Sequence, residues 1–224
     1  MDQRLEYADH AFGTAIGNDT QTDPEEIVRT YTETLGPIAH MRQVHGDRVV
    51  YAHSAGLYEE ADAIFTDQKD LWLAVKTADC VPVLISCPNA VAAVHCGWRG
   101  LQAGLLEKTM QILMDEYNIT AVDMFIHVGP CISQQHYEVD ASYVDIFGAE
   151  HFKPAHKKGK VLMNMVSIVE QQARDFGVPR AHMHDSGLCT FSEKELLHSY
   201  RRNKSEGVDV YQVQLSLVRL LGAN

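Results

Sequence analysis

Short apolar or alternating runs fill much of the first half of the chain, and longer helical patterns interrupt them later. Five early runs are bounded by turn residues, which is typical of β-strands. The strands predicted in this part are 48–52, 62–66, 71–76, 81–86 and 91–95. Two further runs predict later strands at 122–128, before Gly129-Pro130, and at 208–215.

Helix signals stand between these runs. Asp23 followed by a proline supplies an N-cap and a first helical residue, and a glycine follows the helical pattern at 36. Apolar residues recur at helical spacing in two later segments, the second of which ends at a glycine. The predicted helices are 24–35, 100–117 and 164–176, with a short helix after the capping-box sequence 192–195.

Strands cluster early and long helices follow, so the pattern predicts an α+β domain with mixed sheets and not a regular βαβ repeat. The chain has no repeat, low-complexity stretch or Gly/Ser-rich linker. Its 224 residues are therefore predicted to form one domain over 1–224.

Composition narrows the function classes. The net charge of −11 argues against binding to nucleic acid or to an anionic membrane, so any phosphate needs a local basic pocket. No apolar run reaches 18 residues and the first residues lack an apolar signal region, so a cytoplasmic protein is expected. Five cysteines without such a signal predict free thiols: Cys80, Cys87, Cys96, Cys131 and Cys189.

Three dispersed residues, His45, Cys80 and His95, suggest a metal site. Two imidazoles and a thiolate are a common ligand set for zinc, and three protein ligands leave one position open, as in catalytic sites. Their separations of 35 and 15 residues mean that the fold must bring them together. If His95 faces the site from a strand, Cys96 should face away from it.

For each of five further residues, the sequence allows both a functional and a purely structural interpretation. Asp79 is a candidate for orienting a ligand or acting as a general base, or is a solvated turn residue. Trp98 could stack on a flat ring or fill the core. Arg99, with the backbone N–H groups of a following helix, could hold phosphate or form a surface ion pair. Arg201 and Arg202 could contact an anionic substrate or belong to a solvated helix end.

Together these segments resemble the multicopper polyphenol oxidase (laccase-like) domain family, which is also associated with bacterial purine nucleoside phosphorylase and peptidoglycan editing factor. Its most specific motifs here are His-Gly, Ala-Asp-Cys and His-x-Gly-Trp-Arg-Gly. The resemblance implies a layered α/β/β/α domain with two mixed sheets and the same three metal ligands. The matching segments, in family order, are 43–47, 61–63, 77–82, 93–100, 129–132, 137–139, 189–190 and 199–202. The chain departs from the family near 9–13, where Gly-Gly-Val-Ser is lacking, and at 133–136.

The resemblance implies a zinc-dependent enzyme that splits adenosine, inosine or methylthioadenosine with phosphate and deaminates adenosine. Copper is also possible as the metal. Arg99, with Arg201 or Arg202, would hold phosphate, and Asp79 or Glu138 would handle protons. The partners expected are therefore a purine nucleoside and phosphate, and the oligomeric state stays open.

Other functions remain open from the sequence. A cell-wall amide hydrolase would use Cys80 as a metal ligand or as a nucleophile activated by His95. Copper-dependent phenol oxidation would need several copper centres, whereas the sequence suggests one mononuclear site. A non-catalytic metal-binding domain would be expected to have a fourth protein ligand. Cys131 and Cys189 are predicted to be thiols of a pocket wall and not ligands.

Overall fold

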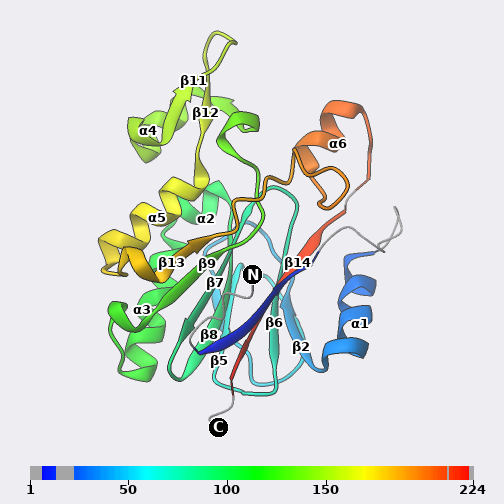
Figure 1. The fold of residues 1–224 in the computed structure, drawn as a ribbon, viewed down its shortest axis with the longest axis vertical. Coiled ribbons are helices and arrows are strands. Elements are labelled where there is room, and N and C mark those ends of the chain that lie inside the picture. The colour runs from blue at the N-terminus through cyan, green and yellow to red at the C-terminus, as the bar shows by residue number, and fades with distance from the viewer. Residues whose placement is uncertain (1–6, 14–22, 211, 222–224) are drawn as a thin grey trace.

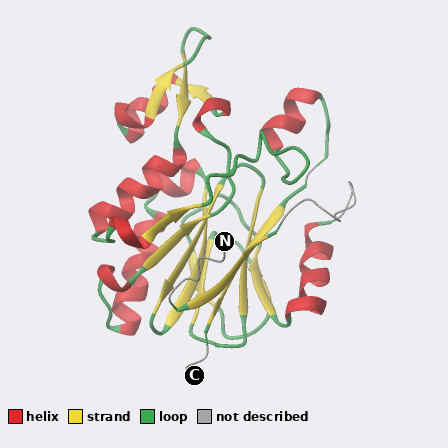
Figure 2. Ribbon diagram, viewed as in Figure 1, coloured by secondary structure: helices red, strands yellow, loops and turns green. Residues whose placement is uncertain are grey.

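The computed structural model describes residues 7–13, 23–210 and 212–221. Two mixed β-sheets pack face to face, and helices cover their outer faces (Figures 1 and 2). The five-stranded sheet has the order β1 (Ala8–Phe12), β14 (Gln214–Leu220), β6 (Trp72–Thr77), β2 (Ile38–Met41) and β4 (Gly56–Tyr58). The six-stranded sheet has the order β13 (Met183–Asp185), β9 (Phe125–Val128), β7 (Val81–Cys87), β8 (Ala90–Cys96), β5 (Ala63–Thr66) and β3 (Val49–Tyr51).

Three apolar clusters separate the layers. Along β7, Val83 and Ile85 face the helices, and Leu84 between them faces the other sheet. This is the two-residue period of a strand, and because both faces are covered the strand is apolar throughout. Helix α1 (Pro24–Leu35) packs Ile27 and Val28 against the outer face of the five-stranded sheet. The predicted α+β fold with layered α/β/β/α packing and two mixed sheets is confirmed.

Helices α2 (Trp98–Gln102), α3 (Leu105–Tyr117) and α5 (Met165–Phe176) cover the six-stranded sheet. A small antiparallel sheet, which the sequence patterns did not reveal, extends beyond them with α4 (Val144–Phe147) beside it (Figure 1). It consists of β10 (Glu138–Asp140), β12 (Lys160–Met163) and β11 (Phe152–Pro154). Its strands are short and contain exposed residues, so they carry only a weak hydrophobic pattern.

The predicted helix over 100–117 is wrong as one continuous element. It divides into α2 and α3 at Gly104, whose φ of 74° is left-handed and ends a right-handed helix. The apolar spacing continues across this break, so periodicity alone could not locate it.

Two late predictions also need correction. The sequence 192–195 is not followed by a helix, because Leu197 donates its N–H to Glu193 in a turn and gives its carbonyl to the guanidinium of Arg202. The next helix, α6 (Tyr200–Glu206), begins after Ser199. The strand predicted over 208–215 begins only at Gln214, because Val208 still bonds the end of α6 through the carbonyl of Asn203.

The strand predicted over 122–128 is shorter in the structure. Thr120 and Asp123 cap one 3₁₀ turn, so β9 begins at Phe125. The helices predicted over 24–35 and 164–176 are confirmed, with Asp23 and Asn164 as their N-caps.

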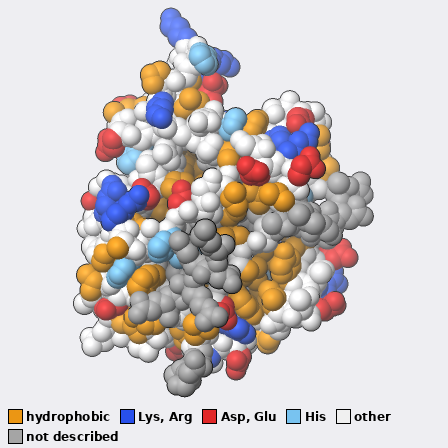
Figure 3. All heavy atoms as spheres, viewed as in Figure 1, with side chains coloured by type: hydrophobic (Ala, Val, Ile, Leu, Met, Phe, Trp, Pro, Cys, Tyr) orange, Lys and Arg blue, Asp and Glu red, His pale blue; other side chains and the backbone are white. Residues whose placement is uncertain are grey.

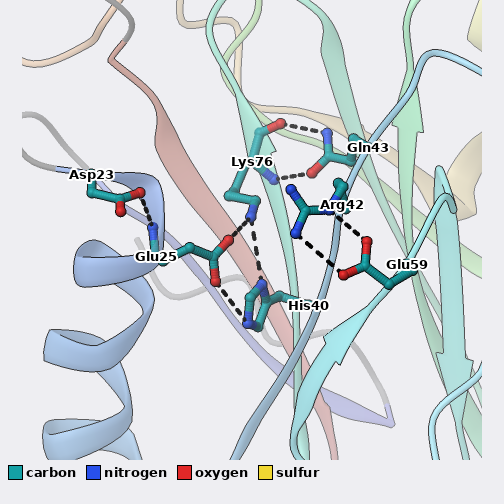
Figure 4. Close-up of polar contacts among 7 residues, drawn as sticks. All are labelled: Asp23, Glu25, His40, Arg42, Gln43, Glu59 and Lys76. Atoms are coloured by element: carbon teal, nitrogen blue, oxygen red, sulfur yellow. Dashed lines mark hydrogen bonds and ion pairs between the residues drawn. The ribbon is translucent and has the colours of Figure 1, made fainter.

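A buried polar cluster fastens α1 to the five-stranded sheet (Figure 4). Glu25 of α1 accepts a hydrogen bond from Lys76 Nζ at 2.9 Å and lies 3.5 Å from His40 Nε2. Lys76 and His40 are both more than 90% buried, so the carboxylate compensates a lysine charge that would otherwise be unpaired. Lys76 therefore directs its ammonium group toward α1, on the outer side of the sheet.

Among the described residues, no helix is long and apolar enough to cross a membrane. On the face shown in Figure 3, acidic and basic side chains are interspersed.

Candidate metal centre and adjoining cavity

Two of the loops that carry the chain from the five-stranded to the six-stranded sheet each bear a predicted metal ligand. His45 lies between β2 and β3, and Cys80 lies between β6 and β7. His95 is the third residue of the set and lies in β8, opposite Pro82 of β7. Cys96 faces the helix layer, so the predicted alternation at this strand end is confirmed.

The three side chains converge, with their potential ligand atoms all within 4.8 Å of one another. His45 Nε2 lies 4.0 Å from Cys80 Sγ, and the two imidazole rings are 4.8 Å apart in an edge-to-face arrangement. His95 uses Nδ1 in a 2.7 Å contact with Asp62, which leaves Nε2 as its second nitrogen. A histidine held through one nitrogen by a carboxylate is the usual arrangement for a metal ligand, so this cluster could hold a metal ion.

Asp62, to which sequence reasoning gave no role, organises two of the three candidate ligands. It is fully buried and accepts N–H bonds from Val44, His45 and Gly46 as well as the bond from His95. These bonds hold His45 at a φ of 60°, in the left-handed region. The signal for Asp62 was a carboxylate at the start of an otherwise apolar strand, since buried carboxylates need several donors.

The backbone of Gly97 closes one side of the cluster. A β-carbon at this position would lie 3.3 Å from both Cys80 Sγ and His45 Cδ2. Its φ of −75° is allowed for any residue, so the glycine is required by space and not by conformation. The backbone therefore approaches the candidate ligands closely at this position.

Electrostatics favours a thiolate at Cys80. Burial opposes ionisation, but the charge of His95 and hydrogen bonds from His45 and His95 outweigh it and lower the pKa of Cys80 to about 6. Burial likewise opposes a charge on His95, yet the thiolate and Asp62 raise the pKa of this imidazole. A thiolate is the form that binds a metal, so the donor set fits a cation such as zinc.

Asp79, next to Cys80, is buried and has a φ of 102°. Such a backbone conformation costs about 1–3 kcal/mol and persists only where surrounding contacts hold it. One carboxylate oxygen accepts a 2.7 Å hydrogen bond from Thr190, and the other accepts the N–H of Arg201 at 2.6 Å. The Asp79 carbonyl accepts from Ile132 N at 2.9 Å. Asp79 is therefore not a solvated turn residue. Its hydrogen bonds connect the Cys80 loop to three residues that lie later in the chain.

A cavity of about 420 Å³ opens beside the cluster. Gln43 ties the His45 loop to its wall, because its carboxamide bonds both the N–H and the carbonyl of Lys76 (Figure 4). The residues that line the cavity are Gln43, His45, Lys76, Thr77, Ala78, Asp79, Cys80, His95, Trp98, Arg99, Tyr137, Tyr200 and Arg201.

Arginines and aromatic rings meet in this cavity. The guanidinium of exposed Arg99 lies 4.4 Å from the Trp98 ring centroid, and no ion pair joins Arg99 to an acid within the described residues. Arg201 lies 5.2 Å from the Tyr137 ring centroid and donates to the carbonyl of Glu138 at 2.9 Å. Tyr137 and Tyr200 were not singled out from the sequence, although Tyr137 adjoins the candidate Glu138.

Arg202 and Glu138 are not among the residues that line the cavity. Arg202 is buried, and its guanidinium donates to the carbonyls of Thr190, Phe191 and Leu197. Adjacent arginines of α6 therefore have different surroundings, with Arg201 at the cavity and Arg202 inside the turn region that precedes the helix.

The predicted pocket-wall thiols line a different cavity. Cys131 and Cys189 border a space of about 550 Å³ between α5 and the loops that follow β9 and β13. Cys87 and Cys96 are fully buried, and all five cysteines are free.

Comparisons with known proteins identify the family of the chain. Residues 5–215 match the family described as multi-copper polyphenol oxidoreductase laccase. The chain belongs to this family. A Haemophilus influenzae protein named purine nucleoside phosphorylase is 34% identical over 213 residues, which cover 90% of this chain and 84% of that protein. A Pseudomonas aeruginosa protein with the same activity in its name is 32% identical over 86% of this chain and 81% of its own length.

Solved structures of similar proteins have the same fold. The family member NMB0706 of Neisseria meningitidis superposes with a TM-score of 0.84 at 28% identity, over 97% of this chain and 96% of that one. YlmD of Geobacillus stearothermophilus has a TM-score of 0.85 at 22% identity, over 97% and 93% of the two chains. The layered fold is therefore shared along nearly the whole chain.

Proposed function

We propose that this family member is a zinc-dependent purine nucleoside phosphorylase that acts on adenosine, inosine and methylthioadenosine and also deaminates adenosine. One observation carries the proposal. Three side chains that could hold a metal ion share a cavity with two arginines and three aromatic side chains. Guanidinium groups suit phosphate, and aromatic faces suit a flat base. The names of the relatives in Haemophilus and Pseudomonas support this reaction over others.

We assign phosphate binding to Arg99 and Arg201, which approach the cavity from α2 and α6. Arg99 has no competing acid partner within the described part of the chain, so its planar fork is available for two phosphate oxygens. Arg202 is omitted because backbone carbonyls already use its guanidinium. The indole ring of Trp98 and the phenol ring of Tyr137 would lie against the nucleoside.

The chain's own groups would divide the remaining tasks. Cys80 acts as a ligand, and Asp79 keeps its loop and the start of α6 in place through Thr190 and Arg201. Glu138 acts through its carbonyl, which orients Arg201. A bound zinc ion would supply Lewis acidity and a water of near-neutral pKa, which deamination requires.

A second candidate is hydrolysis of an amide in a cell-wall precursor by Cys80 itself. The lowered pKa of Cys80 and the raised pKa of His95 favour a thiolate–imidazolium pair, the form that a cysteine nucleophile needs. Copper-dependent phenol oxidation is less well supported, because the part of the chain that the structure describes holds one His/Cys cluster and such oxidases need several copper centres.

The decisive assay measures free base released from adenosine with and without phosphate, and inosine formed in the same samples. Arg99→Lys should weaken apparent phosphate affinity roughly tenfold, as expected for losing one charge-assisted hydrogen bond, while metal content and melting temperature stay unchanged. Deamination, which uses water, should change less than phosphorolysis. Arg180→Lys is the matched control, since Arg180 is an exposed arginine that pairs with Glu170 outside this cavity.

The outcomes separate the candidates. Base release that does not need phosphate would contradict the phosphorylase. Amide hydrolysis that survives metal chelation but not Cys80→Ser would support the cysteine nucleophile. Bound metal without any turnover would leave a metal-binding domain. Equal loss of both activities with a lower melting temperature would remove Arg99 from the substrate contacts.

A further inference from the structure

The second cavity contains two thiols held next to each other by the backbone. The N–H of Cys131 donates to the carbonyl of Leu188, and the N–H of Thr190 donates to the carbonyl of Cys131. These two bonds form an isolated parallel bridge between Cys131 and Cys189. In Figure 1 the orange chain beyond β13 accordingly runs beside the green chain that leaves β9.

A parallel bridge gives the geometry that a disulfide needs. Directly paired residues of neighbouring strands are about 4.8 Å apart, and their side chains project to the same face. Disulfides join α-carbons roughly 4.4–6.8 Å apart, so Cys131 and Cys189 are within bonding range after side-chain rotation. Both residues line the same cavity of about 550 Å³, so a reagent in that space would lie beside the pair.

The two thiols differ in exposure and in pKa, and this difference indicates which of them reacts first. Cys189 is partly exposed, and its sulfur accepts the backbone N–H of Ser133 at 3.4 Å. Although burial opposes it, hydrogen bonds from Ser133 and Ser192 lower the pKa of Cys189. Cys131 is buried, which raises the pKa of its thiol. Cys189 is therefore suited to attack and Cys131 to resolve.

The charged groups of the cavity indicate what could enter. Lys153 supplies a cation, and acidic side chains supply anions on other parts of the wall. A small zwitterion can be matched by such a mixed lining, and the volume is typical of small-molecule sites. The acidic residues are Glu170, Asp185 and Glu193.

We propose that Cys131 and Cys189 form a thiol modification site that small disulfides carrying ammonium and carboxylate groups convert to an intramolecular disulfide. The Cys189 thiolate attacks one sulfur of the reagent, whose S–S bond breaks and releases a first thiol. The Cys131 sulfur then attacks the Cys189 sulfur as a thiolate, the mixed disulfide bond breaks, and the proton of Cys131 passes to the second departing thiolate. Two protein thiols lose two electrons and two protons, and one small disulfide becomes two thiols.

The disulfide would act on the candidate metal centre through short paths of peptide and hydrogen bonds. Ile132, next to Cys131, donates its N–H to the Asp79 carbonyl, and Thr190, next to Cys189, donates to the Asp79 carboxylate. Asp79 in turn precedes Cys80. Joining the two sulfurs would therefore restrain two of the three residues that bond Asp79, and the Cys80 loop should open less often.

The test treats the reduced full-length protein with oxidised glutathione at neutral pH and maps its peptides by mass spectrometry. The expected product is a Cys131–Cys189 cross-link with a mass loss of about 2 Da and no retained glutathione. Cys131→Ser should instead accumulate the glutathione adduct on Cys189. Cys87→Ser, which removes a buried thiol elsewhere, should still form the cross-link.

Two measurements on the wild-type protein keep the inference falsifiable if a variant folds poorly. Cys189 should react roughly tenfold faster than Cys87, and hydrogen exchange across 77–80 should slow after oxidation. A stable glutathione adduct on wild-type Cys189, or no reaction before global unfolding, would overturn the thiol pair. A cross-link that leaves exchange across 77–80 unchanged would overturn its link to the metal centre.

Discussion

The His45 and Cys80 loops both cross from the five-stranded to the six-stranded sheet, and each is fixed by one buried carboxylate, but in opposite ways. The His45 loop receives its carboxylate from outside, because Asp62 lies beside β5 and collects the N–H groups of 44–46. The Cys80 loop contains its own carboxylate, and Asp79 reaches out to residues 111 and 122 positions later in the chain. One ligand is thus positioned by the sheet core, and the other by distant turns and α6.

This difference has a consequence for coupling. Asp62 also contacts His95 directly, so a disturbance there should reach two ligands at once. Asp79 contacts no candidate ligand through its carboxylate, so a disturbance there should reach Cys80 only through the backbone. Substitutions at the two acids should therefore separate metal affinity from stability.

The largest effect is expected for Asp62→Asn. The amide keeps the shape and one acceptor oxygen, but its NH2 group replaces the other oxygen, so two of the four hydrogen bonds to this fully buried carboxylate are lost. The free energy of unfolding should fall by roughly 3–5 kcal/mol and zinc affinity by roughly 10–100-fold. Denaturant titration and a competitive chelator measure the two quantities. Unchanged affinity would show that the sheet core does not position His45 and His95.

Metal removal should next expose the charge state of Cys80. In the metal-free protein its alkylation rate should rise with pH through a midpoint of about 6, because the thiolate is the reactive form. Asp62→Asn should move this midpoint upward, since His95 loses the carboxylate that supports its positive charge. Peptide-level mass spectrometry follows Cys80 alone. A midpoint near that of a free thiol would contradict the His95–Cys80 pairing.

A smaller and different effect is expected for Asp79→Asn. The side-chain amide retains one acceptor and loses one of two hydrogen bonds made by the carboxylate. Stability should fall by about 1–3 kcal/mol, whereas zinc affinity should change by much less than in Asp62→Asn. The same titrations serve here. Equal losses of affinity in the two variants would erase the distinction between the loops.

The smallest effect should come from Thr190→Val. This change removes the hydroxyl donor to Asp79 but keeps the side-chain shape. A loss of about 1 kcal/mol in the free energy of unfolding is expected, with metal content unchanged. Loss of metal in this variant would show that the later chain controls the ligands more tightly than the sheet does.

The sequence revealed those parts of the fold whose pattern is local. Runs such as 81–86 and 91–95 are buried on both faces, so their apolar residues mark strands without knowledge of their partners. Strand β2 was missed because its four residues include His40, whose burial depends on Glu25 in another element. The break at Gly104 was missed because apolar spacing resumes in register after it.

The candidate site also has a part that local sequence predicts and a part that only the fold reveals. Residue types pointed to His45, Cys80 and His95, and the structure brings them together. Nothing local distinguishes Arg201 from Arg202, since successive side chains of a helix point about 100° apart and only the fold decides which meets a cavity. The sequence did carry a signal for Asp62, a carboxylate at the start of an apolar run. Its four hydrogen-bond donors, however, come from two other segments of the chain.

The wide spacing of the candidate ligands along the chain bears on how it folds. Because 35 and 15 residues separate them, an unfolded chain would have to close two long loops to gather them, and it offers no local pair that chelates well. A metal ion is then a poor nucleus for folding and binds after the sheets dock. Nearly all of its binding free energy should consequently appear as resistance of the sandwich to unfolding, so chelators should accelerate the separation of the sheets.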